Sequence, residues 1–197
     1  MTGPPDFDAY YRADPDPWDV GGSFYEQRKR AVVLASLRRS RYGSGWDPAC
    51  GTGHLTVDLA GRCERVLASD ASATAAGLAA ERCAGLPVSV RHRALPDPPD
   101  DDDDDDRFRP DLVVLSEVFY YLSDSVRAAT VALVDHVAAP DAEVVCVHWE
   151  GAPDDAWLSG RGAQTELVSQ LVARGWTRRI HHEDEEFLLD TVTRGSA

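Results

Sequence analysis

The residues best suited to chemistry lie in the segment Asp47-Pro-Ala-Cys-Gly-Thr-Gly53, which combines an acid with two glycines in one short turn. Because glycine has no Cβ, a glycine turn between a strand and a helix lets the backbone approach a bound molecule closely. A second acid, Asp70, ends the next apolar segment, where a carboxylate can accept hydrogen bonds from both ribose hydroxyls of an adenosine moiety. The order of acid, glycine turn, helix, strand and second acid therefore favours a site for an adenosine-containing cofactor.

The glycine turn by itself also fits two other interpretations. A tight turn can need glycines for its backbone geometry alone, without any ligand. A dinucleotide site needs a third glycine where the helix packs on the strand, and this chain has Thr56 there. The acid Asp47 directly before the turn is more typical of methyltransferases than of dehydrogenases. We therefore expect cofactor binding and disfavour a nicotinamide dinucleotide.

A second group of polar and aromatic residues follows the apolar run Leu112–Leu115. Glu117 is our candidate for binding a substrate ammonium group or taking its proton, and a carboxylate that only accepts backbone N–H groups is the alternative. Tyr120, which we also count among the catalytic candidates, and Tyr121 can supply cation–π contacts or a stacking face for a sugar. Since neighbours on a helical turn point to different faces, we expect one of these tyrosines in the core.

Further candidates lie at a later strand end and near the amino terminus. His148 precedes Trp149 and could act as a general base, whereas a hydrogen-bonded structural histidine is the alternative. Trp18, Tyr25 and Arg28 are expected to form a lid. A bidentate fork from Arg28 could bind a cofactor carboxylate, and a solvated helix face is the alternative for this residue. Plain packing against the sheet is equally expected for Trp18 and Tyr25.

The elements that position these residues can be read from hydrophobic periodicity and from capping residues. Ser23 and Glu26 form a capping box at the start of a helix that ends near Arg39. Strands and helices then alternate, which predicts a doubly wound parallel sheet, and the last two strands lack a helix between them and should form an antiparallel hairpin. The predicted elements are a strand near Trp46, a helix His54–Gly61, a strand Arg65–Ser69, a helix Ser72–Cys83, strands Pro87–Ala94 and Leu112–Leu115, a helix Asp124–Val137, a strand Glu143–His148, a helix Gln164–Arg174, and strands Trp176–His181 and Glu186–Val192.

The composition restricts the partners of the chain. Its length of 197 residues suits one domain. Twenty basic against 34 acidic residues give a net charge of −14, which repels phosphate backbones and anionic membranes. We therefore expect a small-molecule substrate rather than nucleic acid or membrane. The polar, proline-rich amino terminus is unlike a signal peptide, and no apolar run reaches membrane-span length, so a cytoplasmic location is expected.

Three features invite a metal or disulfide hypothesis that we do not favour. The four cysteines show no paired spacing, so reduced thiols are the default. The run Asp100–Asp106 holds adjacent, mutually repelling carboxylates, which predict a disordered solvated loop over residues 96–110 rather than a metal cage. The pair His181-His182 lies in a late strand with alternating exposure. We expect no metal site.

Several motifs together resemble the nodulation protein S-like family of S-adenosylmethionine-dependent methyltransferases. That family has a DPW motif, an aromatic-Glu-x-x-Lys/Arg helix, the glycine turn, a fourth strand followed by two tyrosines, an HW pair, an LSG segment and a final apolar strand. The matching segments here are Asp16-Pro17-Trp18, Tyr25-Glu26-Gln27-Arg28-Lys29, Asp111 to Leu122 (DLVVLSEVFYYL), His148-Trp149, Leu158-Ser159-Gly160 and Glu186 to Asp190 (EFLLD). The resemblance covers about residues 8 to 193.

The resemblance implies a fold, a cofactor and an activity. The implied fold is a single-domain, three-layer Rossmann-like α/β domain with a seven-stranded, mostly parallel sheet, formed by residues 23–197 after an amino-terminal arm or lid of residues 1–22. The implied cofactor is S-adenosyl-L-methionine, and the implied reaction is N-methylation of a free amine on an aminosugar or a related secondary metabolite. O-methylation of a natural-product hydroxyl or carboxyl, and a non-catalytic cofactor-binding partner, are the alternatives.

The expected cofactor site departs from the usual pattern at two positions. Ala49 stands where the first glycine of the turn is usual, and Ala94 replaces an acid that often holds the adenine amino group, so that backbone atoms of Leu95 or the side chain of Asp97 would substitute. The turn also resembles that of DNA-adenine methyltransferases, but Ser116-Glu117-Val118-Phe119 replaces their Asn/Asp-Pro-Pro-aromatic motif. The expected cofactor contacts are Trp18, Tyr25, Arg28, Asp47, Ala49, Gly51, Gly53, Leu55, Asp70, Ala71, Leu95 and Ser116. The expected substrate contacts are Glu117, Tyr120, Tyr121, His148 and Trp149.

Overall fold

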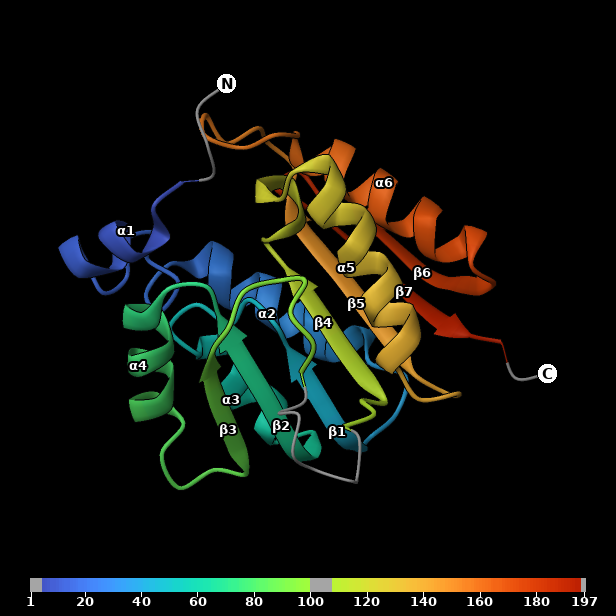
Figure 1. Ribbon diagram of the computed structural model, residues 1–197, viewed down its shortest axis with the longest axis horizontal. Coiled ribbons are helices and arrows are strands. Elements are labelled where there is room, and N and C mark those ends of the chain that lie inside the picture. The colour runs from blue at the N-terminus through green and yellow to red at the C-terminus, as the bar shows by residue number, and fades with distance from the viewer. Residues whose placement is uncertain (1–4, 100–107, 196–197) are drawn as a thin grey trace.

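The computed structural model describes residues 5–99 and 108–195, which form a seven-stranded sheet covered by helices (Figure 1). The strands are β1 (Tyr42–Asp47), β2 (Cys63–Asp70), β3 (Val88–His92), β4 (Leu112–Ser116), β5 (Glu143–Trp149), β6 (Trp176–Glu183) and β7 (Phe187–Arg194). The α-helices are α1 (Phe7–Ala13), α2 (Phe24–Ser36), α3 (His54–Ala60), α4 (Ala73–Arg82), α5 (Asp124–Val137) and α6 (Gly160–Ala173), and a short 3₁₀-helix, η1, spans Phe119–Tyr121.

The strand order is β3-β2-β1-β4-β5-β7-β6. β1 to β5 pair in parallel, whereas β7 runs antiparallel to both β5 and β6. This arrangement confirms the predicted α/β fold with an antiparallel C-terminal hairpin. From β1 the next strands in sequence, β2 and β3, are added towards one edge of the sheet, whereas β4 and the later strands are added towards the other. Such a switch point between β1 and β4 opens a crevice at the carboxyl ends of the strands. Asp47, Asp70 and Ser116 are the last residues of β1, β2 and β4, so all three lie at that edge.

The strand β4 shows why a central strand of this sheet has a continuous apolar run in its sequence. Each of its first four residues is at most 1% exposed, because both faces of the sheet are covered. Val113 and Leu115 join the core beneath α5 and α6, whereas Leu112 and Val114 join the core beneath α2 and α3. The two cores hold the carboxyl ends of the strands in fixed positions.

Two helix boundaries differ from the predicted ones. α2 ends at Ser36 rather than near Arg39, because Leu37 already has an extended backbone. α6 begins at Gly160 rather than near Gln164, and the Ser159 hydroxyl caps it by accepting the Gly162 N–H at 3.1 Å. A Cβ on Gly160 would lie 1.5 Å from the carbonyl oxygen of Trp149, so this close approach of α6 to the end of β5 requires glycine. Glycine favours helices weakly, which hides the true start from the sequence.

The amino-terminal arm contains a helix whose bounds the sequence did not predict. Asp6 caps α1 by accepting the Ala9 N–H at 3.0 Å. From the first turn, Asp8 accepts the Ser72 hydroxyl at 2.7 Å and the Thr74 N–H at 2.9 Å, which ties α1 to the start of α4. These donors lower the pKa of Asp8 to about 2. The division into an arm of residues 1–22 and a domain of residues 23–197 remains a prediction.

Some sequence predictions concern residues outside the described ranges. The aspartate run Asp100–Asp106 belongs to residues 100–107, which the structure does not describe. Within the described residues, no helix is long and apolar enough to cross a membrane.

Candidate active site

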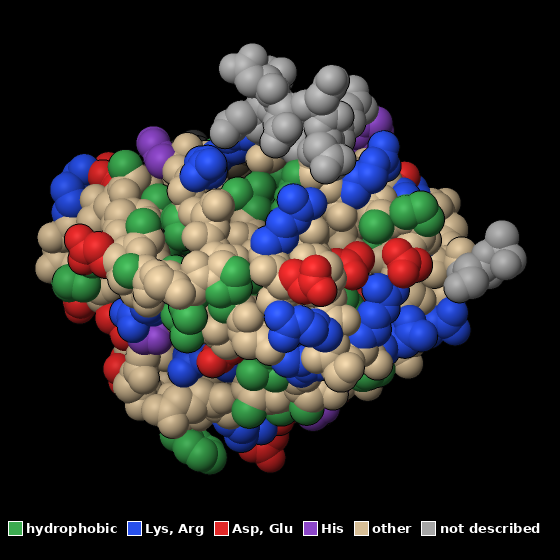
Figure 2. Space-filling view, turned by 90° about the horizontal axis from the view of Figure 1, so that it is seen from below, with side chains coloured by type: hydrophobic (Ala, Val, Ile, Leu, Met, Phe, Trp, Pro, Cys, Tyr) green, Lys and Arg blue, Asp and Glu red, His purple; other side chains and the backbone are tan. Residues whose placement is uncertain are grey.

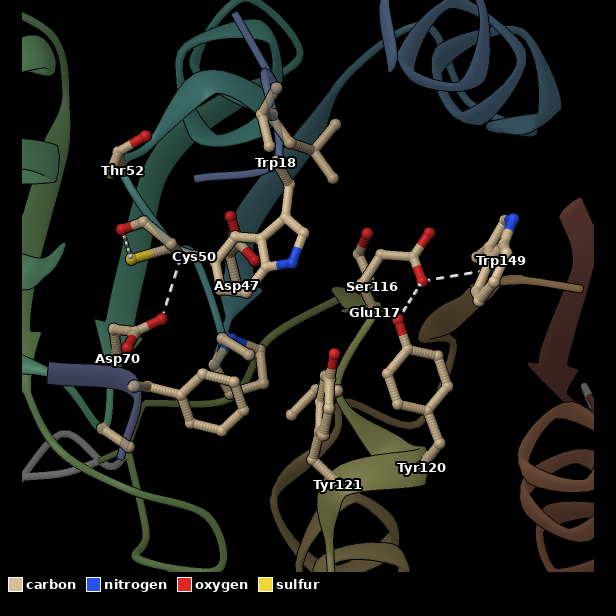
Figure 3. Close-up of a pocket in the computed structure, with 18 of the residues that line it drawn as sticks. Trp18, Asp47, Cys50, Thr52, Asp70, Ser116, Glu117, Tyr120, Tyr121 and Trp149 are labelled. Atoms are coloured by element: carbon tan, nitrogen blue, oxygen red, sulfur yellow. Dashed lines mark hydrogen bonds between the residues drawn. The ribbon is translucent and has the colours of Figure 1, made fainter. Parts of the chain in front are cut away.

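A cavity of about 720 Å³ opens at the carboxyl ends of β1, β2 and β4 (Figure 3). Side chains of the two amino-terminal helices, α1 and α2, complete its wall. Two buried polar atoms on this wall, the Tyr25 hydroxyl and His54 Nε2, have no hydrogen-bond partner among the described residues. Buried polar atoms are normally paired, so these two atoms are available as partners for a polar ligand in the cavity.

Asp70 and the glycine turn face one another across the floor of the cavity. The Asp70 carboxylate accepts the Gly51 N–H at 2.9 Å and the Ser72 N–H at 2.8 Å. Gly51 has a φ of +53°, which side chains rarely permit, and a Cβ there would lie 3.1 Å from the Tyr11 hydroxyl. Burial raises the pKa of Asp70, while the two backbone donors oppose the rise. The geometry expected from the sequence, a turn and an acid around a common crevice, is present.

Asp47 is buried beside the same turn. It is 1% exposed, and its carboxylate accepts the Thr56 hydroxyl at 2.7 Å. Burial raises the pKa of Asp47 to about 7, with the Thr56 hydroxyl opposing the rise. Thr56, which stands where a dinucleotide site has its third glycine, therefore donates a hydrogen bond to a buried acid.

Most of the residues expected to contact the cofactor line the cavity. These are Trp18, Tyr25, Asp47, Ala49, Gly51, Leu55, Asp70, Ala71, Leu95 and Ser116. Gly53 does not line it. A Cβ on Gly53 would lie 3.1 Å from Ala79, so this glycine, with a φ of +84°, serves the close packing of α3 against α4.

The structure places Arg28 outside the cavity, contrary to the sequence expectation. Its guanidinium pairs with Asp184 at 2.5 Å and with Glu186 at 3.0 Å in the turn between β6 and β7. The next residue, Lys29, points into the cavity instead, because neighbouring residues on a helix point about 100° apart. The sequence signal for Lys29 was its place in the pattern Glu26-x-x-Lys29, which puts both side chains on one face of α2.

Glu117 follows β4 and presents its carboxylate to the cavity between Ser116 and Trp149 (Figure 3). Oε2 accepts the Tyr120 hydroxyl at 2.5 Å and the Trp149 N–H at 2.8 Å, and Oε1 accepts the Lys29 ammonium at 2.5 Å. Glu117 itself has a φ of +55°, so these bonds hold an uncommon backbone conformation. Burial raises the pKa of Glu117, but Lys29 and the other donors outweigh burial, and the pKa is lowered overall. The group is therefore a fixed anion.

His148 does not line the cavity, contrary to its expected roles as a base and a substrate contact. It is 0% exposed. Nε2 accepts the Phe119 N–H at 3.3 Å, which fixes Nδ1 as the donor to Gln164 Oε1 at 2.7 Å. Burial lowers the pKa of His148, so the ring is neutral. With both nitrogens bonded inside the protein, this histidine is structural, the alternative that the sequence left open.

Aromatic side chains line the part of the cavity around Glu117. Tyr120 is 4% exposed and packs at 4.5 Å, ring centroid to ring centroid, against the less buried Tyr121, as expected for one core tyrosine of the two. Trp149 is 42% exposed at the rim. Cavity-lining residues that the sequence analysis missed include Phe7, Tyr11, Lys29, Arg30, His54 and Trp157.

Comparisons with known proteins place this geometry in context. Residues 10–174 match the family described as nodulation protein S (NodS). A crystal structure of a putative methyltransferase from Pseudomonas syringae is 29% identical, with a TM-score of 0.68 over 87% of this chain and 100% of that one. The N-methyltransferase NodS from Bradyrhizobium japonicum WM9, in complex with S-adenosyl-L-homocysteine, is 19% identical, with a TM-score of 0.77 over 96% of this chain and 100% of that one.

A third solved structure resembles the chain along its whole length. It is the 1,6-didemethyltoxoflavin-N1-methyltransferase from Burkholderia thailandensis, which is 18% identical, with a TM-score of 0.70 over 100% of this chain and 92% of that one. At such low identity, this likeness and the one to the Bradyrhizobium enzyme concern the fold. No curated protein sequence matches the chain.

Proposed function

The chain belongs to the nodulation protein S family of S-adenosylmethionine-dependent methyltransferases, and on that premise we propose that it N-methylates a small amine, with an aminosugar or a related secondary metabolite as the acceptor. The observation that carries the choice of an amine is the Glu117 carboxylate, an ionised group at the end of β4 in the same cavity as Asp70. The proposal concerns the acceptor, since the family already implies the reaction class.

The described residues fit the cofactor. Asp70 would accept the ribose hydroxyls, because its carboxylate is already oriented by the Gly51 and Ser72 N–H groups and keeps unused lone pairs. Gly51 and Ala49 leave the backbone open beside it. The unpaired Tyr25 hydroxyl and His54 Nε2 offer further polar contacts on the same wall.

The cofactor, when bound, supplies an electrophilic methyl group on a sulfonium sulfur. The protein has to align an acceptor lone pair with that methyl group and keep water away, and positioning of this kind is worth roughly 7 kcal/mol or more. The aromatic side chains of Trp18, Tyr121 and Trp149 around the cavity can exclude water. An amine that arrives as an ammonium ion has to lose one proton before its nitrogen can attack.

The charge of the cavity favours positively charged ligands. Even without Asp47, whose pKa is raised to about 7, carboxylates outnumber cationic side chains on its described lining. Asp16, Glu26, Asp70 and Glu117 face only Lys29 and Arg30. Such a lining attracts a sulfonium and an ammonium, whereas a carboxylate acceptor would meet repulsion. A neutral hydroxyl acceptor experiences neither effect, so O-methylation of a hydroxyl is the alternative that needs an experiment.

The experiment is a methyl-transfer assay with labelled S-adenosylmethionine and two matched acceptors, D-glucosamine and N-acetyl-D-glucosamine. We expect transfer to D-glucosamine only, at a rate that rises with pH towards the amine pKa, because only the free base has a lone pair. Equal methylation of both sugars would contradict N-methylation and support a hydroxyl acceptor. Tight binding of S-adenosylhomocysteine without any transfer would support the non-catalytic alternative.

A further inference from the structure

Lys29, the only lysine of the chain, is enclosed on the cavity wall by two carboxylates and an aromatic ring. Its ammonium donates to Glu26 Oε1 at 2.7 Å and to Glu117 Oε1 at 2.5 Å, and it lies 4.7 Å from the centre of the Tyr25 ring. The residue is 3% exposed. A buried ammonium is costly unless it is paired in this way, so the cluster depends on both glutamates.

Within the cluster, few hydrogen-bond donors of Lys29 and few acceptor sites of Glu117 remain unused. An ammonium has three donors, and here two are used by carboxylates while the Tyr25 ring covers another side. At most one donor of Lys29 is therefore left for a ligand. A carboxylate has about four lone-pair sites, and Glu117 fills three of them with Lys29, Tyr120 and Trp149. One site on Oε1 stays free, and the side chain is 25% exposed.

We propose that Lys29 is a positioning residue, which keeps the Glu117 carboxylate charged and oriented so that its one free lone pair binds an N–H of the acceptor. This inference rests on the proposed amine acceptor and specifies how the amine is held. Glu117 then acts as an anchor and leaves the proton of the acceptor to solvent. The sequence had left open whether Glu117 binds an ammonium group or takes its proton, and the cluster favours binding.

The charges of the cluster agree with this assignment. Burial lowers the pKa of Lys29, but Glu117 and Glu26 outweigh burial and the pKa is raised overall, so the ammonium stays charged. Burial raises the pKa of Glu26, whereas at Glu117 the Lys29 ammonium and the Tyr120 hydroxyl help to outweigh burial and the pKa is lowered overall. A carboxylate that is harder to protonate than usual is a weak base and a strong hydrogen-bond acceptor.

The first test uses the fact that a single lysine gives a single signal. In protein labelled with ¹³C-lysine, the ε-carbon resonance of the wild type should not titrate between pH 7 and 10.5. In Glu117→Gln it should titrate within that range, because one of the two counter-charges is lost. The matched control is Glu186→Gln, which changes a partner of Arg28 and should leave the signal unmoved. A wild-type midpoint at the ordinary lysine value of about 10.4 would overturn the proposal.

The second test separates positioning from a purely structural role. With D-glucosamine as the probe, Lys29→Met should raise KM by about tenfold or more and move the acid limb of kcat/KM to higher pH, because Glu117 loses its counter-charge. Lys29→Arg should restore most of both parameters, and the affinity for S-adenosylhomocysteine should stay within about twofold in both variants, because neither changes Asp70. A wild-type KM and pH profile in Lys29→Met would refute the assignment.

These tests separate this inference from the proposed function. If the wild type does not methylate D-glucosamine, the amine acceptor fails for this probe, while the lysine titration still decides whether the cluster is held as described.

Discussion

Among the residues of the cavity, Asp47 is a carboxylic acid kept deep in the protein with only a hydroxyl partner among the described side chains. Burial raises its pKa to about 7, far above the value near 3.9 expected in the unfolded chain. The folded protein therefore retains this proton between about pH 4 and pH 7, where the unfolded chain releases it. The stability that this proton contributes is present at low pH and is lost as the pH rises through this window.

We predict that Asp47→Asn raises the free energy of unfolding at pH 8 and does so much less at pH 5. An asparagine oxygen still accepts the Thr56 hydroxyl, but it carries no charge to bury. The difference between variant and wild type should grow by on the order of 2 kcal/mol from pH 5 to pH 8. Urea denaturation at both pH values measures it, with the pH 5 pair as the internal control. An equal difference at both values would mean that Asp47 titrates normally.

Asp70 has a different task, which a binding measurement can isolate. We predict that Asp70→Ala weakens binding of S-adenosylhomocysteine by about ten- to hundredfold, because a carboxylate that would accept both ribose hydroxyls is lost, at a cost of roughly 1.5–3 kcal/mol. The matched control is Asp141→Ala, which removes an exposed aspartate that pairs with Arg39. Calorimetric titration measures both. An unchanged affinity in Asp70→Ala would remove the adenosine site from the end of β2.

The sequence predicts which residues belong to the site more reliably than it predicts the direction in which their side chains point. Asp70 and Glu117 could be predicted because an acid that ends a strand or directly follows one has to lie at the carboxyl edge of the sheet. Arg28 and Lys29 could not be told apart, because one residue along a helix changes the side-chain direction by about 100° and both carry the same charge. The interior position of His148 could not be predicted, because its partners Phe119 and Gln164 come from other elements, 29 residues before it and 16 residues after it.

At the scale of elements, a chain of hydrogen-bonded side chains connects β6, β7, α6 and β5 to the loop that carries Glu117, and its members are buried except for His181 at the start. His181 Nδ1 lies 2.9 Å from Asp190 Oδ1, and Asp190 Oδ2 accepts Gln164 Nε2 at 2.7 Å. The Gln164 amide also donates to the Cys146 carbonyl at 3.0 Å, so its oxygen is fixed towards His148. The chain ends where His148 accepts the Phe119 N–H, two residues after Glu117.

We predict that Gln164→Leu lowers turnover several-fold and leaves the affinity for S-adenosylhomocysteine unchanged. The substitution removes the acceptor of the His148 Nδ1 proton, and an unsatisfied buried group costs roughly 1–3 kcal/mol. It also frees the histidine to change tautomer and release the Phe119 N–H. Nitrogen chemical shifts of ¹⁵N-histidine report the tautomer. Gln170→Leu, on the same helix but bonded only to the half-buried Glu166, is the control. A wild-type tautomer together with reduced turnover would argue against this route.

The elements themselves could be predicted where apolar periodicity is strong. The strands β2, β4 and β5 cross the core, and their apolar runs predicted them, whereas β1 (YGSGWD) has no such run and was placed only as a strand near Trp46. The helix α1 could not be predicted, because none of its residues is buried and it is held by caps and by Asp8. Its aromatic residues Phe7, Tyr10 and Tyr11 have helical spacing, but a helix of seven residues is too short for this period to stand out in the sequence.

At the scale of the whole molecule, the charges of the described residues are not spread evenly. Figure 2 shows the side from which β1, β2 and β3 begin, and basic side chains are prominent there between the acidic ones. They are arginines, because the single lysine of the chain is buried at the cavity. The cavity, at the opposite ends of these strands, has more carboxylates than cations on its described lining. With a net charge of −14 on the chain, the electrostatic potential at the cavity should be negative beyond what the lining alone supplies.

This potential can be tested with two ligands that differ by one charge. S-adenosylmethionine carries a sulfonium, whereas S-adenosylhomocysteine has a neutral sulfur in the same framework. We predict that raising NaCl from about 0.02 to 0.5 M weakens binding of S-adenosylmethionine at least about threefold more than binding of S-adenosylhomocysteine, because the screening length falls from about 20 Å to about 4 Å. Calorimetric titration of both ligands against the same protein cancels changes in hydrophobic contacts. Equal weakening would mean that the carboxylates of the cavity are already compensated when the cofactor binds, and that the negative field does not select cations.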